Sequence, residues 1–168
     1  DVVPGFRVRQ INLYDRLMPT GLCWAPDGTL LVSSLKGRVW SGKDRDGDAI
    51  EESFVPYSHE LAAPYGLAAG PDYVDVIHKS ALLRLYDEDH DGWAERTETV
   101  ASGWGHTDDY HDWAVGLPKD EEGAYFVALP CQQDDRSPAA AHLRGRILRL
   151  VPEVPTKQSP RRFRLDEW

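Results

Sequence analysis

The feature that most constrains this fold is a step of glycine followed by leucine, which recurs along the chain in similar surroundings. Gly21, Gly66 and Gly116 each open such a step, and they lie 45 and 50 residues apart. Gly28 and Gly123 each follow the glycine of their own step by seven residues, so the similarity extends beyond the step. A period of about 40 to 50 residues is typical of propeller blades, each of which is one small sheet. The repeat therefore predicts a β-propeller.

Short runs of β-forming residues lie within each repeat unit. The runs "TLLVSS", "YVDVIH" and "YFVALP" are separated by Pro-Asp, Asp-Gly and Lys-Gly pairs, which favour tight turns. Helical periodicity is almost absent. We therefore expect an all-β fold of antiparallel four-stranded meanders, with three blades at about residues 6–56, 57–102 and 103–152.

Three blades do not close a ring, because propellers have about four to eight of them. Residues 161–168, "RRFRLDEW", alternate between polar and apolar side chains and are expected to begin a further blade. The whole chain, 1–168, is thus predicted to be one segment of a β-propeller, either a fragment of a larger propeller or one protomer of it. The alternative is a self-contained β-sandwich built from the same strands.

The charge and composition of the chain exclude several classes of partner. Its formal net charge is −9 and its pI is about 5.1, so nucleic acid and anionic membrane surfaces are not expected to bind. No apolar run reaches the roughly 18 residues of a membrane helix, and we expect no membrane insertion. Cys23 and Cys131 lack metal or haem spacing. They are either one disulfide or two buried thiols, of which the thiols are favoured.

The most specific motif is a run of carboxylates between two strand-like segments. In "DEDHDGWAERTE", residues 87–98, acidic side chains occupy positions 1, 3, 5, 9 and 12 and glycine occupies position 6, which is the spacing of a calcium-binding EF-hand loop. Carboxylates this close repel one another unless a cation binds them. The predicted calcium ligands are the side chains of Asp87, Asp89, Asp91, Glu95 and Glu98 and the carbonyl of Trp93.

A second acidic loop, "DRDGDAIEE", stands at the same place in the preceding repeat unit. Ala49 replaces the glycine of position 6, and Val55 stands at position 12. The predicted ligands here are Asp44, Asp46, Asp48 and Glu52. The alternative for both loops is a solvated acidic turn. Calcium sites of this kind suit the millimolar calcium outside the cytosol, so we expect a secreted or periplasmic protein.

A histidine-rich insertion is the segment that is suited to chemistry. "GWGHTDDYHDWAVGL" contains His106 and His111 among Asp108, Asp109 and Asp112. A carboxylate that hydrogen-bonds to histidine fixes its tautomer and raises its basicity, which favours a general base. The two alternatives are a transition-metal site, for which the spacing of the histidines is not diagnostic, and a polar loop that packs on the propeller face.

Several segments resemble known families. "GLCWAPDGTLLVSSLKGRVW", "DRDGD", "PYGLA" and "DEDHDGWAE" resemble the blades of six-bladed quinoprotein glucose dehydrogenases and sorbosone dehydrogenases. "GWGHTDDYHDWAVGLP", "LPCQQDDRS" and "LRGRILRLVP" resemble more closely a bacterial family of large secreted propeller proteins, which carry the label of membrane-bound dehydrogenases and are often fused to c-type haem domains. The second resemblance covers nearly the whole chain. Together they imply six blades, pyrroloquinoline quinone (PQQ) as cofactor, a sugar or alcohol as substrate, and the remainder of the propeller or a haem c domain as partner.

The resemblance also implies a catalytic base. In the quinoprotein dehydrogenases a histidine precedes the Asp-Gly turn of a blade by about a dozen residues and takes the proton of the sugar hydroxyl while hydride passes to PQQ. His111 precedes Gly123 by twelve residues, and "AYFVAL" follows, so His111 matches that base. The spacing is one residue longer than in the family, and "DWAVGLPKDEEG" replaces its glycine-rich step. The cofactor-binding arginines would lie mostly on later blades, so catalysis by this chain alone is not expected.

Two hypotheses of different classes follow. The first is an oxidoreductase propeller in which His111 is the base, Asp112 or Asp109 orients it, and His106 lies nearby in the same insertion. The second is a calcium-stabilised propeller without chemistry, which binds a carbohydrate or a protein through the aromatic residues of the insertion. These aromatic residues are Trp104, Tyr110 and Trp113.

Overall fold

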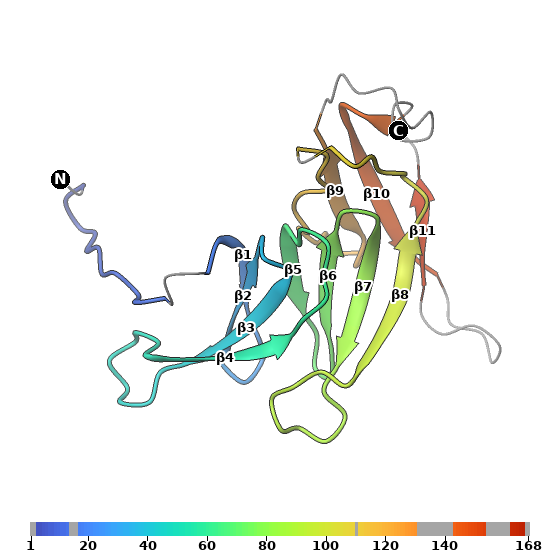
Figure 1. Cartoon of the computed structure of the whole chain (residues 1–168). Helices are drawn as coiled ribbons and strands as arrows, with labels where there is room; N and C mark the ends of the chain where they lie inside the picture. Colours follow the sequence, from blue (N-terminus) through green and yellow to red (C-terminus); the bar gives the residue numbers. More distant parts are fainter. Residues whose placement is uncertain (1–2, 14–16, 110, 131–142, 154–161, 167–168) are drawn as a thin grey trace.

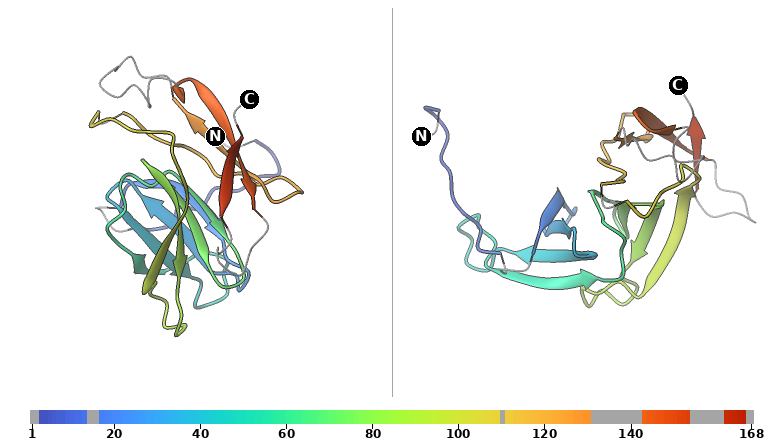
Figure 2. Two further views of the ribbon diagram at one scale, coloured as in Figure 1. Left: turned by 90° about the vertical axis from the view of Figure 1, so that its right-hand side faces the viewer. Right: turned by 45° about the horizontal axis from the view of Figure 1, so that its top comes forward.

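The computed structural model describes residues 3–13, 17–109, 111–130, 143–153 and 162–166. Its strands form three antiparallel sheets, which follow one another along an arc (Figures 1 and 2). The first sheet contains β1 (Pro19–Trp24), β2 (Leu30–Ser34), β3 (Arg38–Lys43) and β4 (Ser53–Ser58). The second contains β5 (Gly66–Ala69), β6 (Val74–His78), β7 (Ala81–Tyr86) and β8 (Arg96–Ser102). The third contains β9 (Tyr125–Leu129), β10 (Arg146–Pro152) and β11 (Phe163–Asp166).

The first two sheets are meanders in which each strand pairs with the next strand along the chain. Residues 3–13, which the sequence placed partly in the first blade, form no strand. Ile11 and Leu13 pack against an apolar cluster of the first sheet, and the chain before them extends away from that sheet (Figure 1). The predicted all-β class and partial propeller are confirmed by this arrangement. Within the described residues, no helix is long and apolar enough to span a membrane.

The third sheet corrects the expectation for the end of the chain. Its strand order is β11-β10-β9, and bridges from Val115 to Ala128 and from Lys119 to Tyr125 place residues 115–119 beside β9. β11 pairs antiparallel with β10, so the described part of 161–168 is the outer strand of the third sheet rather than the start of a further blade. The alternation of polar and apolar residues predicted a strand correctly. Alternation does not specify which neighbour the strand joins.

The repeated glycines lie where the inner segments of the three sheets come together. A Cβ atom on Gly21 would stand 3.2 Å from the Cα of Gly66, and one on Gly66 would stand 2.8 Å from the carbonyl carbon of Gly116. The backbone N–H of Gly116 also donates a hydrogen bond to the carbonyl of Tyr65 at 3.2 Å. Gly66 therefore has no room for a larger side chain, a Cβ on Gly21 would crowd its neighbours, and the left-handed φ of 81° at Gly116 favours glycine there.

The core lies between neighbouring sheets. One apolar cluster joins the first sheet to the second through residues such as Leu31, Val39 and Val76. A second cluster joins the second sheet to the third, and its largest fully buried members include Trp104 and Tyr125. Each sheet thus contributes one face to each contact, which is the packing expected of blades.

A buried polar group links the second sheet to the third. The guanidinium of Arg84 on β7 donates two hydrogen bonds to the carboxylate of Asp75 on β6, at 2.7 and 2.8 Å. The hydroxyl of Tyr125 on β9 donates to the same carboxylate at 2.9 Å. Asp75 is fully buried, and the guanidinium lies 3.7 Å above the ring of Tyr73. Burial and the charge of Asp75 raise the pKa of Tyr125, because both disfavour a phenolate there.

Cys23 is a free thiol, half buried on β1. Burial raises its pKa to about 11, although a hydrogen bond with the backbone of Ala69 opposes the shift. The interpretation of Cys23 as a thiol is therefore confirmed. Cys131 lies outside the described residues.

Candidate functional site

The two acidic loops join β3 to β4 and β7 to β8, and so they occupy equivalent places in the first two sheets (Figure 1). In the first loop one carboxylate oxygen from each of Asp44, Asp46, Asp48 and Glu52 lies within 4.8 Å of the others. In the second loop the same holds for Asp87, Asp89, Asp91 and Glu95. The structure thus brings together the residues that the sequence predicts at positions 1, 3, 5 and 9.

The hydrogen bonds of the two loops match position by position. The carboxylate at position 1 accepts from the backbone N–H of position 6, from Ala49 to Asp44 at 2.8 Å and from Gly92 to Asp87 at 2.9 Å. The glutamate at position 9 accepts from the N–H of position 2 at 3.0 Å in the first loop and 2.8 Å in the second. The loops are therefore two copies of one structure, although they share few residues beyond the carboxylates.

Both loops turn through left-handed backbone at positions 4 and 6. In the first loop φ is 82° at Gly47 and 64° at Ala49, and in the second it is 61° at His90 and 95° at Gly92. Each loop thus has one glycine and one larger residue at these positions, in opposite order. Ala49 adopts the required turn without glycine, at a cost of about 1–2 kcal/mol for a left-handed L-residue.

Position 12 is where the second loop departs from the EF-hand pattern. Glu98 lies on β8 in register with Arg84, and its carboxylate accepts a hydrogen bond from the hydroxyl of Tyr86 at 3.3 Å. It does not join the group of Asp87, Asp89, Asp91 and Glu95. In an EF-hand, a helix follows the loop and places the side chain of position 12 on the ion. In this chain an extended strand begins at Arg96, before position 12.

Trp93 has a backbone role in the second loop. Its N–H donates to the carboxylate of Asp91 at 2.8 Å, and its ring packs against His59 with the centroids 4.9 Å apart. The contact with His59 joins the second loop to the chain that follows β4. The predicted role of the Trp93 carbonyl as a ligand stays a prediction.

The chemistry of the donor set suits calcium. Each loop presents four carboxylates, and Ca²⁺ prefers six to eight oxygen ligands, which backbone carbonyls and water can complete. Backbone hydrogen bonds from Gly47 and Ala49 lower the pKa of Asp44, so that carboxylate is charged at neutral pH. Burial and the charges of Asp87 and Glu95 raise the pKa of Tyr57 to about 12. Within the described residues, these two loops are the groups of His, Cys, Asp or Glu close enough to share an ion.

The histidine-rich insertion lies at the opposite end of the strands. It follows β8, whereas the acidic loop precedes β8, so the strand separates the two (Figure 1). The side chain of His111 is 66% exposed, and its Nδ1 lies 3.7 Å from the carboxylate of Asp109. The ring of His111 lies 5.5 Å from that of Trp113, which in turn stacks on Tyr65 at 4.7 Å. His111 is therefore exposed and lies near both a carboxylate and an aromatic pair.

The carboxylate of Asp112 is engaged by residues other than His111. It is fully buried, forms an ion pair with Arg144, and accepts a hydrogen bond from the backbone N–H of Thr107. Its role in the structure is to hold the insertion against the third sheet. Of the two carboxylates that the sequence offered to orient His111, the one in position is Asp109.

His106 and a second histidine, His78, lie near each other on this face. Burial lowers the pKa of His78, and the charge of exposed His106 lowers it further. The Nδ1 of His78 accepts a hydrogen bond from the N–H of Ala62 at 3.2 Å. His78 was not among the residues predicted from the sequence. The sequence could have indicated His78, because "VDVIHKS" ends a strand at a turn. That turn lies at the same end of the sheet as the insertion.

The aromatic residues of the insertion are not equivalent. Trp104 is fully buried, and its indole N–H donates to the carbonyl of Lys79 at 3.1 Å, so it is not available to stack on a ligand. Trp113 is partly exposed. Tyr110 lies outside the described residues. The expected aromatic surface is therefore reduced, in the described chain, to Trp113 and its partner Tyr65.

Several solved structures are similar to this chain, and one of them matches it over most of its length. It is the crystal structure of a protein from Thermus thermophilus that is described as an oxidoreductase (glucose dehydrogenase). The two superpose with a TM-score of 0.63 at 18% sequence identity. The likeness establishes the fold. It covers 82% of this chain but 45% of the other, so this chain spans about half the length of that protein. No family model matches this sequence, and no curated protein matches it.

Proposed function

We propose that this chain is a calcium-stabilised segment of a quinoprotein-type dehydrogenase propeller that oxidises a sugar or another alcohol. The observation that carries the proposal is the position of His111. This histidine is exposed, lies beside Asp109 and the Trp113–Tyr65 pair, and belongs to a fold like that of a protein described as a glucose dehydrogenase. A secreted or periplasmic location is part of the proposal, because weak calcium sites are filled there.

Oxidation of an alcohol removes a proton from oxygen and a hydride from carbon. In this proposal the neutral imidazole of His111 takes the proton, and the carboxylate of Asp109, 3.7 Å from Nδ1, stabilises the imidazolium that forms. The ring of Trp113 packs beside His111 and limits its rotation. His106 lies on the same face, and we assign it no direct step.

The hydride requires an acceptor, for which the family resemblance suggests PQQ. Among the described residues, two cations beside the insertion are already engaged, since Lys79 donates to the carbonyl of Asp109 at 2.7 Å and Arg144 pairs with Asp112. We therefore name no cofactor-binding residue on this chain. In the proposal the acceptor is held by the remainder of the propeller, and a haem c domain receives the electrons.

The acidic loops have a structural role in this proposal. They lie at the opposite end of the sheets from His111, and each would hold one Ca²⁺ with four carboxylates. The bound ion neutralises the mutual repulsion of those carboxylates and fixes the connection between the two outer strands of its sheet.

The test is dye reduction by a protein that contains the complete propeller, supplied with calcium and PQQ, across a panel of aldoses and alcohols. We expect turnover that His111→Asn reduces by at least about 100-fold, the usual contribution of a general base. The matched control is His106→Asn, in the same exposed loop, which should retain most of the activity. Cofactor that binds, as followed by its absorbance, without turnover of any substrate would refute the enzyme assignment.

A second candidate function is a propeller that binds carbohydrate without chemistry. The specific observation is the stacked pair of Trp113 and Tyr65, because the face of an aromatic ring is a common platform for a sugar. This candidate predicts calorimetric binding of a sugar without PQQ. Trp113→Ala should abolish that binding, and His111→Asn should leave it unchanged.

A further inference from the structure

A cleft lies between the first and second sheets, at the end of the strands from which the acidic loops extend (Figure 1). Its volume is about 380 Å³, within the range of sites that hold a small molecule. It is bounded by the β1–β2 turn, by residues of β3 and β4, by the β5–β6 turn and by the second acidic loop. The cleft therefore lies at the boundary of two blades, at the opposite end of the strands from His111.

Two buried hydroxyl groups line the cleft. Ser41 on β3 and Tyr57 on β4 are 5% and 8% exposed. Ser41 lies opposite Leu31 in the register, and Leu31 and Tyr57 belong to the apolar cluster between the two sheets, so all three side chains face the second sheet. Within the described chain neither hydroxyl forms a hydrogen bond, although most buried polar groups in proteins have a partner. A ligand in the cleft would supply the missing partners.

Tyr57 also connects the cleft to the second acidic loop. Its backbone carbonyl accepts a hydrogen bond from the N–H of Ala94 at 2.8 Å, which ties the end of the loop to the first sheet. Burial and the charges of Asp87 and Glu95 raise the pKa of Tyr57 to about 12, so its hydroxyl keeps its proton at neutral pH and can donate as well as accept. Asp87 and Asp91 belong to both the loop and the lining of the cleft, so an ion in that loop would border the cleft.

The polar groups of the cleft suit a neutral ligand that is rich in hydroxyl groups. The described lining contains four carboxylates and the ammonium of exposed Lys43, so its excess of negative charge disfavours an anion. Ca²⁺ in the second loop would offset most of that excess, which removes the attraction for an organic cation. Hydroxyl groups can donate to carboxylates and accept from Lys43, while Leu31 and Val74 offer apolar contact to C–H groups. The four carboxylates are those of Asp27, Asp72, Asp87 and Asp91.

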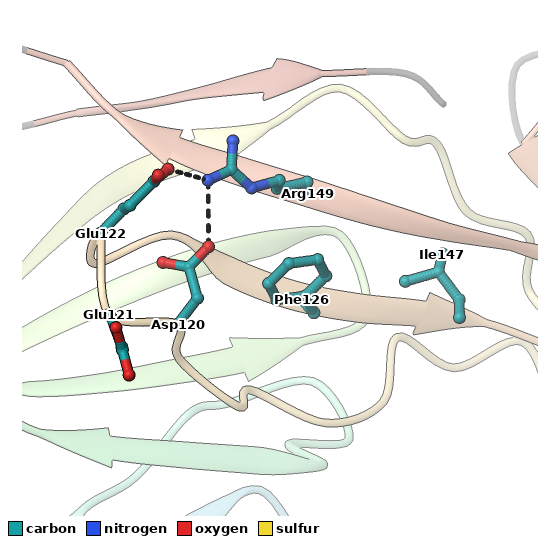
Figure 3. A pocket seen from close by; sticks show the side chains of 6 residues that line it. All are labelled: Asp120, Glu121, Glu122, Phe126, Ile147 and Arg149. Atoms are coloured by element: carbon teal, nitrogen blue, oxygen red, sulfur yellow. Dashed lines mark hydrogen bonds and ion pairs between the residues drawn. The ribbon is translucent and has the colours of Figure 1, made fainter.

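A larger hollow on the third sheet is different, because its cation is already paired. The hollow has a volume of about 780 Å³, and Phe126 and Ile147 form part of its lining (Figure 3). The guanidinium of Arg149 pairs there with Asp120 at 3.0 Å and with Glu122 at 2.7 Å (Figure 3). The unpartnered hydroxyls, rather than the volume, therefore distinguish the cleft between the first two sheets.

We propose that this cleft binds a neutral polyhydroxylated molecule of about monosaccharide size, and that the calcium ion of the second acidic loop is part of the site. Ca²⁺ takes six to eight oxygen ligands, so the four carboxylates leave positions that two neighbouring hydroxyl groups of the ligand can fill. Tyr57 and Ser41 hydrogen-bond to other hydroxyl groups of the same molecule. The inference rests on the calcium-binding role of the second loop and not on the catalytic role of His111.

The test is isothermal titration calorimetry of the chain in 1 mM calcium, with glucose, mannose, xylose and mannitol as probes. We expect one site per chain for at least one probe. Tyr57→Phe and Ser41→Ala should each weaken binding by roughly 2–12-fold, the usual effect of losing one neutral hydrogen bond. Neither change should lower the thermal midpoint appreciably, because the lost hydroxyl has no partner in the folded chain. Tyr86→Phe is the matched control, since its hydroxyl donates to Glu98 and does not line the cleft, and it should bind as the parent does.

Variants of the two acidic loops test whether the ion belongs to the site. Asp87→Asn should abolish binding together with one calcium ion, as counted by elemental analysis. Asp44→Asn should remove the other ion and leave binding unchanged, because no carboxylate of the first loop lines the cleft. Trp113→Ala should also leave binding unchanged, because Trp113 lies at the other end of the strands.

Three results would overturn the proposal. A chain that holds two calcium ions but binds none of the probes would refute it and leave the calcium sites standing. Binding that survives the loss of the second loop's ion, or that Trp113→Ala abolishes, would place the ligand elsewhere. A chain that holds no calcium and binds no probe would refute the calcium assignment and this proposal together. Each of these results leaves the role of His111 to be decided by dye reduction.

Discussion

Removal of Arg84 is expected to be among the most destabilising single changes in this chain. Arg84→Leu leaves the carboxylate of Asp75 fully buried without the two hydrogen bonds at 2.7 and 2.8 Å, so that the hydroxyl of Tyr125 is the side-chain donor that still reaches it. Breaking a buried ion pair by removing one partner costs about 3–5 kcal/mol. Tyr125→Phe removes one hydrogen bond to a charged group and should cost about 1.5–3 kcal/mol.

A double variant separates the destabilisation caused by the unpaired charge from the net contribution of the ion pair to stability. Asp75→Leu combined with Arg84→Leu leaves no buried charge, so it should be less destabilising than Arg84→Leu alone. Arg96→Leu is the matched control. Arg96 also lies over a tyrosine ring, at 3.6 Å, and pairs with Glu88 at 2.6 Å, but 47% of its side chain is exposed. Its loss should therefore destabilise the chain far less than the loss of Arg84, because water screens an exposed pair.

The assay for this series is equilibrium unfolding in urea, in calcium buffer, followed by tryptophan fluorescence. At this chain length 1 kcal/mol corresponds to about 2–4 °C in the thermal midpoint, so Arg84→Leu should also lower the midpoint by roughly 6–20 °C. The prediction is wrong if Arg84→Leu costs no more than Arg96→Leu. It is wrong also if the double variant costs the sum of its two single changes.

Three further changes test local features of the structure. Ala49→Gly should stabilise the calcium-saturated chain by about 1 kcal/mol, and Gly92→Ala should destabilise it by a similar amount, because both positions have left-handed φ. The measurement is the free energy of unfolding in urea. Effects of the same sign in the two variants would contradict this. Burial lowers the pKa of His78 in the folded chain, so its contribution to stability is present above the ordinary histidine pKa of about 6.5 and is lost as the pH falls through the folded value. His78→Gln should make the thermal midpoint fall less steeply as the pH is lowered. An unchanged dependence of the midpoint on pH would refute the assignment. Because burial raises the pKa of Cys23 to about 11, its thiol should react with a disulfide reagent at pH 8 far more slowly in the folded than in the urea-unfolded chain, as measured in a Cys131→Ser background.

The parts of the fold that the sequence predicts well are those encoded by local or periodic patterns. The spacing of Gly21, Gly66 and Gly116 predicts the blades, because crowding by neighbouring backbone at Gly21 and Gly66 and the left-handed φ of Gly116 each favour glycine. The acidic loops are predictable because all of their ligands lie within one contiguous turn. The residues at positions 1, 3, 5 and 9 of each loop can be recognised without information from the rest of the chain.

The features that the sequence did not predict depend on partners far along the chain. Asp112 looks like a neighbour of His111 in the sequence, yet its partner is Arg144, more than 30 residues away. Trp104 looks like a surface aromatic, but the contact between the second and third sheets buries it. Glu98 fits the EF-hand spacing, but β8 begins at Arg96 and carries it away from the loop. In each case a long-range contact decides where the side chain lies.

The central claim is that the two acidic loops are calcium sites that stabilise a partial propeller. The most direct test is the thermal midpoint of the purified chain in 1 mM calcium and after chelation, with bound metal counted by elemental analysis. For a dissociation constant of about 0.1 mM, each site contributes roughly 1.4 kcal/mol, so the two together should raise the midpoint by about 6–11 °C. We predict two calcium ions per chain, of which Asp44→Asn and Asp87→Asn each remove one. A chain that retains no calcium and whose midpoint does not respond to chelation would contradict the account.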